Sequence, residues 1–222
     1  MADPLATLPR IVVNEVLASP VAPGLDAIEL YNPTAADADI SGWFLSDDAG
    51  YPWKYRVPDG TILRSGCFVR FDESQFNPTP GAGVSFRFSA LGEEAYLFSA
   101  DASHNLTGYS QGFVFGGSAP GESFGRYINS IGEEQFPPQI LPTLGTNNPG
   151  PRVGPVVISE IHYAPLTPTS AFVELRNITA HAVPLYDPGQ PADTWQMKGL
   201  GFTFPTGIVM PAGGFLLLAA AD

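Results

Sequence analysis

Apolar and polar residues alternate over short stretches of this chain. In Ile28-Glu-Leu-Tyr-Asn32 the alternation places Ile28 and Leu30 on one face of an extended strand, and Glu29 and Tyr31 on the other. No window combines a 3.6-residue apolar period with helix caps, so we expect an all-β protein made of two packed antiparallel sheets. The pattern predicts strands over residues 10–18, 26–32, 40–46, 53–57, 61–71, 84–89, 93–99, 112–116 and 122–127.

The chain also contains an internal repeat. Residues 11–16 (Ile-Val-Val-Asn-Glu-Val) resemble residues 156–161 (Val-Val-Ile-Ser-Glu-Ile), at an offset of 145. At the same offset, residues 27–32 resemble residues 172–177. A third match, at an offset of 147, relates residues 57–69 to residues 204–216. Ordered matches at nearly one offset indicate a domain type that occurs twice in tandem.

This repeat, together with the composition between its copies, predicts the domain organisation. The segment before the second copy is rich in Pro, Gly and Asn, which is typical of a linker. We therefore expect a tail over residues 1–9, a complete domain over 10–145, a linker over 146–154 and an incomplete second repeat over 155–222.

Composition and charge narrow the functional classes. With 24 Gly, 23 Pro and 44% hydrophobic residues, the chain is too apolar for disorder and too rich in helix breakers for a bundle. The net charge of −12 disfavours nucleic acid as a partner. The single Cys67 excludes an internal disulfide, and no apolar run is long enough for membrane insertion as a helix.

The two ends of the sequence also carry expectations. Residues 1–5 lack the basic region and apolar core of a signal peptide, so none is predicted. Residues 215–222 stop within or just after an apolar run typical of a strand, which leads us to expect a piece of a longer protein.

Several motifs in the first copy occur in one order: residues 13–16 (Val-Asn-Glu-Val), 28–33 (Ile-Glu-Leu-Tyr-Asn-Pro), 40–47 (Ile-Ser-Gly-Trp-Phe-Leu-Ser-Asp), 57–61 (Val-Pro-Asp-Gly-Thr), 92–97, 123–127 and 142–147. In this order they resemble the lamin tail domain family, in its bacterial form. The second copy keeps the Ser-Glu-Ile, Val-Glu-Leu-Arg-Asn and Phe-Pro-Thr-Gly pieces. Where a Ser-Gly-Trp would fall it has residues 185–189 and a later Trp195, which leaves its third strand undefined.

The resemblance implies an immunoglobulin-like antiparallel β-sandwich with no catalytic activity. It implies a structural or protein-binding module, for adhesion or as a spacer, within a larger secreted or cell-surface protein. Half a sandwich leaves strand edges unpaired, so we expect other chains, or copies of this chain, to bind the incomplete second repeat. We expect no DNA binding, because the basic residues Lys54, Arg56, Arg64 and Arg70 lie in acidic surroundings.

The densest aromatic segment is Tyr51-Pro-Trp-Lys-Tyr-Arg56. If alternate residues share a face, Tyr51, Trp53 and Tyr55 point one way while Lys54 and Arg56 point the other. The rings could recognise a peptide or a sugar, or they could belong to the core. We expect two of the three in the core, and take Tyr51, Trp53, Tyr55 and Arg56 as candidate partner-binding residues.

Acidic residues suggest an alternative function. Asp37 to Asp48 imitates an EF-hand loop, but its last position lacks the bidentate Glu and its flanks lack helices. We expect no cofactor; a calcium site using Asp47 and Asp48 is the open alternative. It would fit a carbohydrate- or calcium-dependent binding module attached to an enzyme.

A third alternative is a hydrolase that uses Ser123. Gly121-Glu-Ser-Phe-Gly125 matches the Gly-x-Ser-x-Gly elbow, which requires a following helix and a histidine contact. No helical period follows, so we expect Ser123 in a strand. Glu15 and Glu29, which recur as Glu160 and Glu174, would need a cleft to act as a glycosidase pair. We expect them to bond to backbone groups or to a neighbouring Arg instead.

Overall fold

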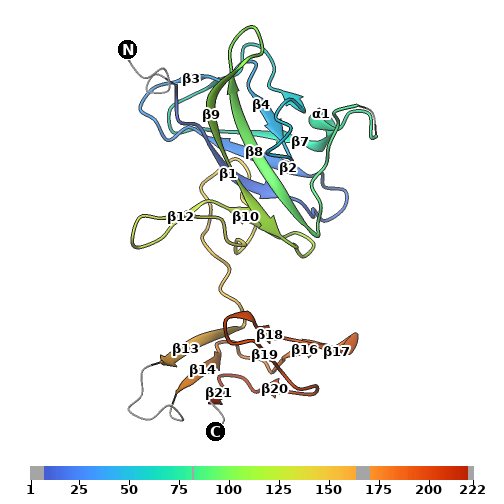
Figure 1. Ribbon diagram of the computed structural model, residues 1–222, viewed down its shortest axis with the longest axis vertical. Coiled ribbons are helices and arrows are strands. Elements are labelled where there is room, and N and C mark those ends of the chain that lie inside the picture. Colours follow the sequence, from blue (N-terminus) through green and yellow to red (C-terminus); the bar gives the residue numbers. More distant parts are fainter. Residues whose placement is uncertain (1–7, 82, 164–170, 220–222) are drawn as a thin grey trace. The chain divides into compact units, whose positions relative to one another are not determined.

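The computed structural model describes residues 8–81, 83–163 and 171–219. The chain forms two compact units, Met1–Arg152 and Val153–Asp222, each of which is described by itself (Figure 1). The boundary lies inside the segment 146–154 that the composition marks as a linker. Within the described residues, no helix is long and apolar enough to cross a membrane.

The first unit is built from two four-stranded antiparallel sheets. One sheet has the order β10-β1-β2-β7 and the other β5-β4-β8-β9. Strands β1 and β2, which follow each other in the sequence, are the two central strands of the first sheet. Strand β10, which comes much later in the sequence, pairs with the outer edge of β1. The first sheet contains β1 (Val12–Leu17), β2 (Ala27–Tyr31), β7 (Phe68–Asp72) and β10 (Ser123–Gly125). The second contains β4 (Phe44–Ser46), β5 (Tyr55–Arg56), β8 (Gly92–Ala100) and β9 (Leu106–Gly116).

Smaller elements complete this unit. The pairs β3–β6 and β11–β12 are short antiparallel ladders outside the two main sheets. A single helical turn, α1, is capped by Asp72, whose side chain accepts from the Ser74 N–H. Their bounds are β3 (Ala38–Asp39), β6 (Ile62–Leu63), α1 (Glu73–Phe76), β11 (Tyr127–Ile128) and β12 (Glu134–Gln135).

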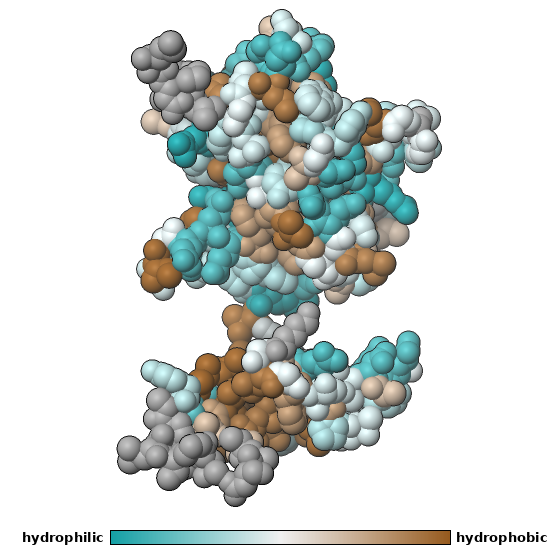
Figure 2. All heavy atoms as spheres, viewed as in Figure 1, coloured by the Kyte–Doolittle hydropathy of each residue, from teal (hydrophilic) through white to brown (hydrophobic). Residues whose placement is uncertain are grey.

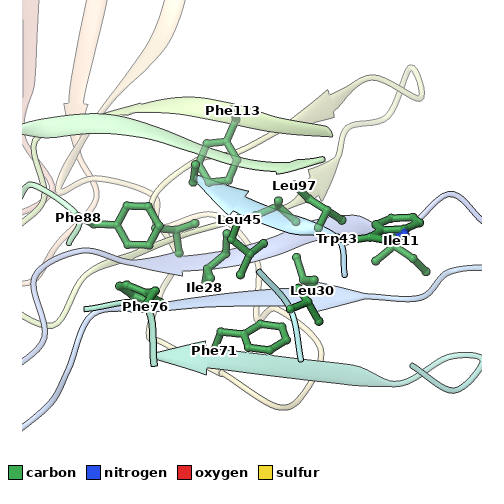
Figure 3. Packing of buried hydrophobic residues seen from close by; sticks show 14 of the residues in the cluster. Ile11, Ile28, Leu30, Trp43, Leu45, Phe71, Phe76, Phe88, Leu97 and Phe113 are labelled. Carbon is green, nitrogen blue, oxygen red and sulfur yellow. The ribbon is translucent and has the colours of Figure 1, made fainter. Parts of the chain in front are cut away.

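The core lies between the two sheets. Ile28 and Leu30 point into it from β2, as the alternation predicts, and meet Leu45 and Leu97 from the second sheet (Figure 3). All four side chains are fully buried. Burial of apolar surface, at roughly 25 cal/mol per Å², is the main force that holds such sheets together. The all-β sandwich expected from the sequence is therefore confirmed.

A β-bulge interrupts the pairing of β1 with β2. The register shifts between Val13 and Glu15, so that Asn14 is the additional residue. Val13 and Val16 consequently both belong to the core, although simple alternation would place them on opposite faces. Asn14 and Glu15 instead carry their polar groups into hydrogen bonds away from that core.

The predicted and observed strands differ most at two places. Residues 84–89 form no strand, although Phe86 and Phe88 are buried. Their rings pack around Phe76, with the Phe76 and Phe86 centroids 4.6 Å apart, so they fill the core without joining a ladder. The predicted strand 61–71 is divided into β6 and β7 by a turn at Gly66, whose φ is +68°.

The second unit has one three-stranded sheet of order β13-β14-β21, with strands β13 (Val156–His162), β14 (Phe172–Asn177) and β21 (Phe215–Ala219). Its small core contains Val173, Leu175, Leu185, Phe204 and Met210. Around it lie three short ladders and a 3-10 turn (Lys198–Leu200). The ladders are β15–β20 (Val183–Pro184 with Val209–Met210), β16–β17 (Tyr186–Asp187 with Gln190–Thr194) and β18–β19 (Gln196–Met197 with Phe202–Thr203).

The second unit repeats the pairing of the first. β13 pairs with β14 in the register of β1 with β2, displaced by 145 residues, and its bulge falls between Ile158 and Glu160. β14 pairs with β21 as β2 pairs with β7. The described residues of this unit include no equivalent of β8, β9 or β10.

The structure also defines the third strand that the sequence leaves undefined. The Trp195 N–H donates to the Leu185 carbonyl at 2.9 Å, and its carbonyl accepts from the Phe204 N–H at 3.0 Å. Trp43 makes the same two backbone bonds in the first unit: its N–H donates to the Ile40 carbonyl, and its carbonyl accepts from the Val57 N–H. Trp195 therefore occupies the place of Trp43, and the β16–β17 hairpin is an insertion before it.

Candidate functional site

The aromatic segment divides between surface and core. The Tyr51 and Trp53 side chains are 47% and 45% exposed, and their rings meet edge to face at 6.4 Å. Only Tyr55 packs inward, against Phe71 and Phe76. The expectation of two core rings is therefore wrong. Its cause is that β5 begins at Tyr55, so residues 51–54 are irregular and do not alternate as a strand does.

Basic side chains near this segment are engaged by carboxylates. Arg56 Nη2 donates to Asp59 Oδ1 at 2.6 Å, and Arg70 pairs with Asp72 at 2.8 Å. Lys54 Nζ pairs with Asp47. These contacts reduce the positive potential that a phosphate backbone would require.

The two calcium candidates serve local contacts. The Asp47 carboxylate holds Lys54, and Asp48 Oδ1 accepts from the Gly50 N–H at 2.7 Å, closing a turn. Across residues 8–81, 83–163 and 171–219, no three His, Cys, Asp or Glu side chains are grouped so that they could hold a metal ion.

Ser123 is a buried structural donor. Its residue is 0% exposed, and its Oγ donates to Glu15 Oε1 at 2.5 Å. The chain continues into β11 rather than into a helix. A hydrolase nucleophile must reach a substrate and a histidine base, and this hydroxyl points at a carboxylate inside the fold. The geometry around Ser123 is therefore not that of a hydrolase nucleophile.

Glu15 and Glu29 form a buried pair on the outer face of the first sheet. They lie opposite each other in the β1–β2 register, and both are 0% exposed. Glu15 accepts from the Thr143 N–H at 3.0 and 3.1 Å; Glu29 accepts from Asn14 Nδ2 at 2.8 Å and from the Gly145 N–H. Burial raises the pKa of Glu15, and it raises the pKa of Glu29 to about 7. The expected bonds to backbone groups are present.

The backbone donors to this pair, the N–H groups of Thr143 and Gly145, belong to residues 136–152, which we call the closing segment. Gln139 Nε2 donates to the Gly125 carbonyl at 3.0 Å, and its Oε1 accepts from the Gly150 N–H at 3.2 Å. Asn148 Nδ2 donates to the Asn14 and Arg126 carbonyls at 3.0 and 2.9 Å. Much of the predicted linker is thus bound to the first sandwich. Composition cannot reveal this, because buried amide side chains give no periodic signal.

The described residues of the second unit present the same carboxylates and include no closing segment. Glu174 Oε1 accepts from Ser159 Oγ at 2.7 Å, as Glu29 accepts from Asn14. Glu160 is exposed and has no hydrogen-bond donor in the part of the chain that the structure describes. Ile158 and Ile161 are 51% and 57% exposed, whereas the equivalent Val13 and Val16 are fully buried. We call residues 158–162 of β13 the open edge.

An apolar hollow of about 540 Å³ adjoins the open edge, lined among others by Ile161, Phe172, Val173, Leu200, Phe202 and Leu218. Figure 2 shows hydrophobic residues gathered on the second unit, while on the first unit they are scattered among polar ones. Contiguous exposed apolar surface of this kind marks an interaction site in soluble proteins.

Comparison with known proteins assigns a family to the first unit only. Residues 5–112 match the family model of the Lamin Tail Domain. No curated protein matches the chain, and no solved structure matches it. The match does not extend to the second unit, whose membership of this family stays a prediction.

Proposed function

The first unit of this chain belongs to the lamin tail domain family, and from that premise we propose that the protein is a binding or architectural module without catalytic activity. The first unit, with its buried core between two sheets, is the scaffold of this module. The second unit is an incomplete repeat of the same domain type that provides the docking surface. The module forms part of a larger secreted or cell-surface protein, a location that rests on the family resemblance alone.

One observation carries this proposal. The second unit keeps the registers of the first but has no equivalent of β8, β9 and β10 among its described residues. Within the described residues, strand β13 therefore pairs on one edge only, and Ile158 and Ile161 are exposed where their equivalents are buried. A free strand edge beside apolar surface recruits another strand. The natural partner is another protein chain or a second copy of this one.

The Tyr51–Trp53 pair supports a second candidate function. Two exposed rings at 6.4 Å form a surface on which a sugar ring or a peptide could rest. A module of this type would work beside an attached enzyme. The Asp47 carboxylate, which could join a calcium site, pairs with Lys54.

Light scattering after size exclusion tests the docking function on the whole chain. We expect association that increases with concentration, and we expect Ile161→Asp to abolish it by placing a charge on the open edge. Leu91→Asp is the matched control, since Leu91 is 92% exposed on the first unit. A chain that stays monomeric, and whose β13 amides exchange hydrogen as slowly as those of β1, would contradict the proposal.

A further inference from the structure

Two exposed aromatic rings of the first unit stand at an angle to each other. The Tyr51 and Trp53 rings meet at 6.4 Å with 75° between their planes, and both side chains are nearly half exposed. The rings therefore form a corner rather than a flat platform, and we call them the aromatic corner. A sugar ring stacks on one broad face, whereas a cation is held by several faces that meet at an angle, as in the aromatic cages that recognise methylated lysine.

The loop that carries the aromatic corner is braced by its own hydrogen bonds. Ser46 Oγ lies 2.8 Å from the Tyr51 carbonyl oxygen and 3.0 Å from that of Asp48. The Tyr51 N–H donates to the Asp48 carbonyl at 3.2 Å, and the Lys54 N–H donates to the carbonyl of buried Pro52 at 3.0 Å. A braced loop presents its rings in a fixed arrangement, so little conformational entropy is lost when a ligand binds.

Two carboxylates of this loop region are available to a cation. Glu94 Oε2 accepts from the Ala49 N–H at 2.8 Å, which holds this carboxylate against the loop, and Asp48 lies in the loop itself. Each uses one oxygen for a backbone N–H, and neither pairs with a Lys or Arg side chain among the described residues. The Lys54 ammonium is paired with Asp47, so it does not neutralise them.

A neighbouring carboxyl group responds to these charges. Burial raises the pKa of Glu93, and the charges of Asp47 and Glu94 raise it further, while the Ser89 N–H and the Lys54 ammonium lower it. Carboxylates thus outnumber cations around the start of β8 and the loop before β5. Negative potential of this kind attracts a cation and repels an anion, and it adds nothing to the binding of an uncharged sugar.

We propose that the aromatic corner binds an arginine side chain of a partner protein. The planar guanidinium stacks on an aromatic face, and the N–H groups at its edge donate to the remaining oxygen atoms of Asp48 and Glu94. A lysine ammonium carries the same charge but cannot stack, so it binds more weakly. This inference names the ligand of the second candidate function and rests on it, and it does not involve the second unit.

The probe is a short synthetic peptide with one arginine between two glycines, blocked at both ends. NMR of the isotopically labelled 222-residue chain follows the indole N–H signal of Trp53, which Trp53→Phe identifies, and the signals of Trp43 and Trp195 are internal references. We expect a saturable shift of the Trp53 signal alone. The same peptide with citrulline, which has the shape of arginine without its charge, should bind about tenfold more weakly. The lysine peptide should bind with an affinity between the two.

Two variants of the chain test the ring and the charge separately. Tyr51→Ala removes one wall of the aromatic corner and should weaken binding of the arginine peptide about threefold. Glu94→Gln keeps an oxygen for the Ala49 N–H but removes the charge, and it should also weaken binding about threefold. Asp37→Asn is the control, because it removes one charge from the loop after β2 and keeps the acceptor for the Ser65 N–H.

Equal binding of the arginine and citrulline peptides would overturn the inference, and so would equal effects of Glu94→Gln and Asp37→Asn. Cellotriose, an uncharged sugar, is titrated in parallel and should bind at least tenfold more weakly than the arginine peptide. If cellotriose shifts the Trp53 signal and the arginine peptide does not, the inference is wrong and the second candidate function stands. If neither ligand shifts it, both are wrong, and light scattering still tests the docking function of the second unit.

Discussion

Asn32 provides the sharpest test of how the first unit is held together. It is fully buried, and its Nδ2 donates to the carbonyls of Ala36 and Leu63, both at 2.9 Å. Its Oδ1 accepts from the N–H and the hydroxyl of Thr34, at 3.0 and 2.7 Å. One side chain thereby fixes the turn after β2 and ties it to β6.

Asn32→Ala removes all four bonds, including the buried one to the Leu63 carbonyl. A net hydrogen bond contributes about 1 kcal/mol, and an unsatisfied buried group costs about 1–3 kcal/mol. Allowing for water that reaches the Thr34 side, we expect the first unit to lose about 3 kcal/mol. For a unit of this size that lowers its Tm by about 6–12 °C.

The second unit contains an internal comparison. Asn177 donates to the carbonyls of His181, Met210 and Pro211 and accepts from Thr179, in the same arrangement. Because this unit has a much smaller core, Asn177→Ala should unfold it while the first unit keeps its Tm. Differential scanning calorimetry measures the transitions, and hydrogen exchange resolved by peptide assigns them to the units.

Exposed Asn147 is the control for these substitutions, since its side chain has no buried partner. If Asn32→Ala lowers stability no more than Asn147→Ala does, the turn is held by other contacts. A loss in both units from Asn32→Ala alone would also refute the reasoning, because its bonds lie within the first unit.

Three further predictions concern the first unit. Gly112→Ala should lower the free energy of unfolding by at least about 3 kcal/mol, because its Cβ would lie 2.1 Å from the Ala95 carbonyl oxygen. Gly116→Ala in the same strand should change it little, because no atom lies within 4 Å of its Cβ position. Denaturant unfolding of the two variants measures the difference. The folded pKa of Glu29 is about 7, above the ordinary 4.5, so the folded state holds a proton that the unfolded state releases. The bound proton should therefore contribute about 3 kcal/mol to the free energy of unfolding below about pH 4.5, and this contribution should be lost as the pH rises to about 7. Thermal unfolding as a function of pH measures it. A Tm that rises from pH 5 to pH 8 would contradict the burial of this carboxylate. Trp53→Ala should cost less than about 1 kcal/mol in thermal unfolding because the ring is half exposed; a core ring would cost about 3–5 kcal/mol.

Alternation in the sequence predicts which side of a segment faces the core, and it does so even where no strand forms. Phe86 and Phe88 are both buried, as a strand over residues 84–89 requires. Yet the Phe86 N–H bonds to the Phe76 carbonyl and the Phe88 N–H to the Asp26 carboxylate, rather than to a neighbouring strand. A strand requires both buried side chains on one face and backbone hydrogen bonds to a neighbouring strand. The periodicity of the sequence indicates only the burial.

The candidate sites depend on contacts that local patterns do not encode. The closing segment is held by amide side chains, such as those of buried Gln139 and half-buried Asn148, that bond to backbone groups outside the segment. The motifs that resemble the family include residues 142–147, so the sequence indicated part of the closing segment. The pairing of β13, β14 and β21, by contrast, could be predicted, because the repeat aligns these strands with β1, β2 and β7.

The hydrogen bond between Thr143 and Glu15 determines how late during synthesis the first unit can finish folding. The two residues are 128 positions apart. At about 5–20 residues per second, a ribosome needs about 6–25 s to make the chain between them. Throughout that interval β1 has neither β10 nor the closing segment, and its Glu15 carboxylate stands in water at an unpaired edge. A charge in that position disfavours pairing of this edge with another chain, so we expect the carboxylate that is buried in the finished domain to oppose association while the chain is being made.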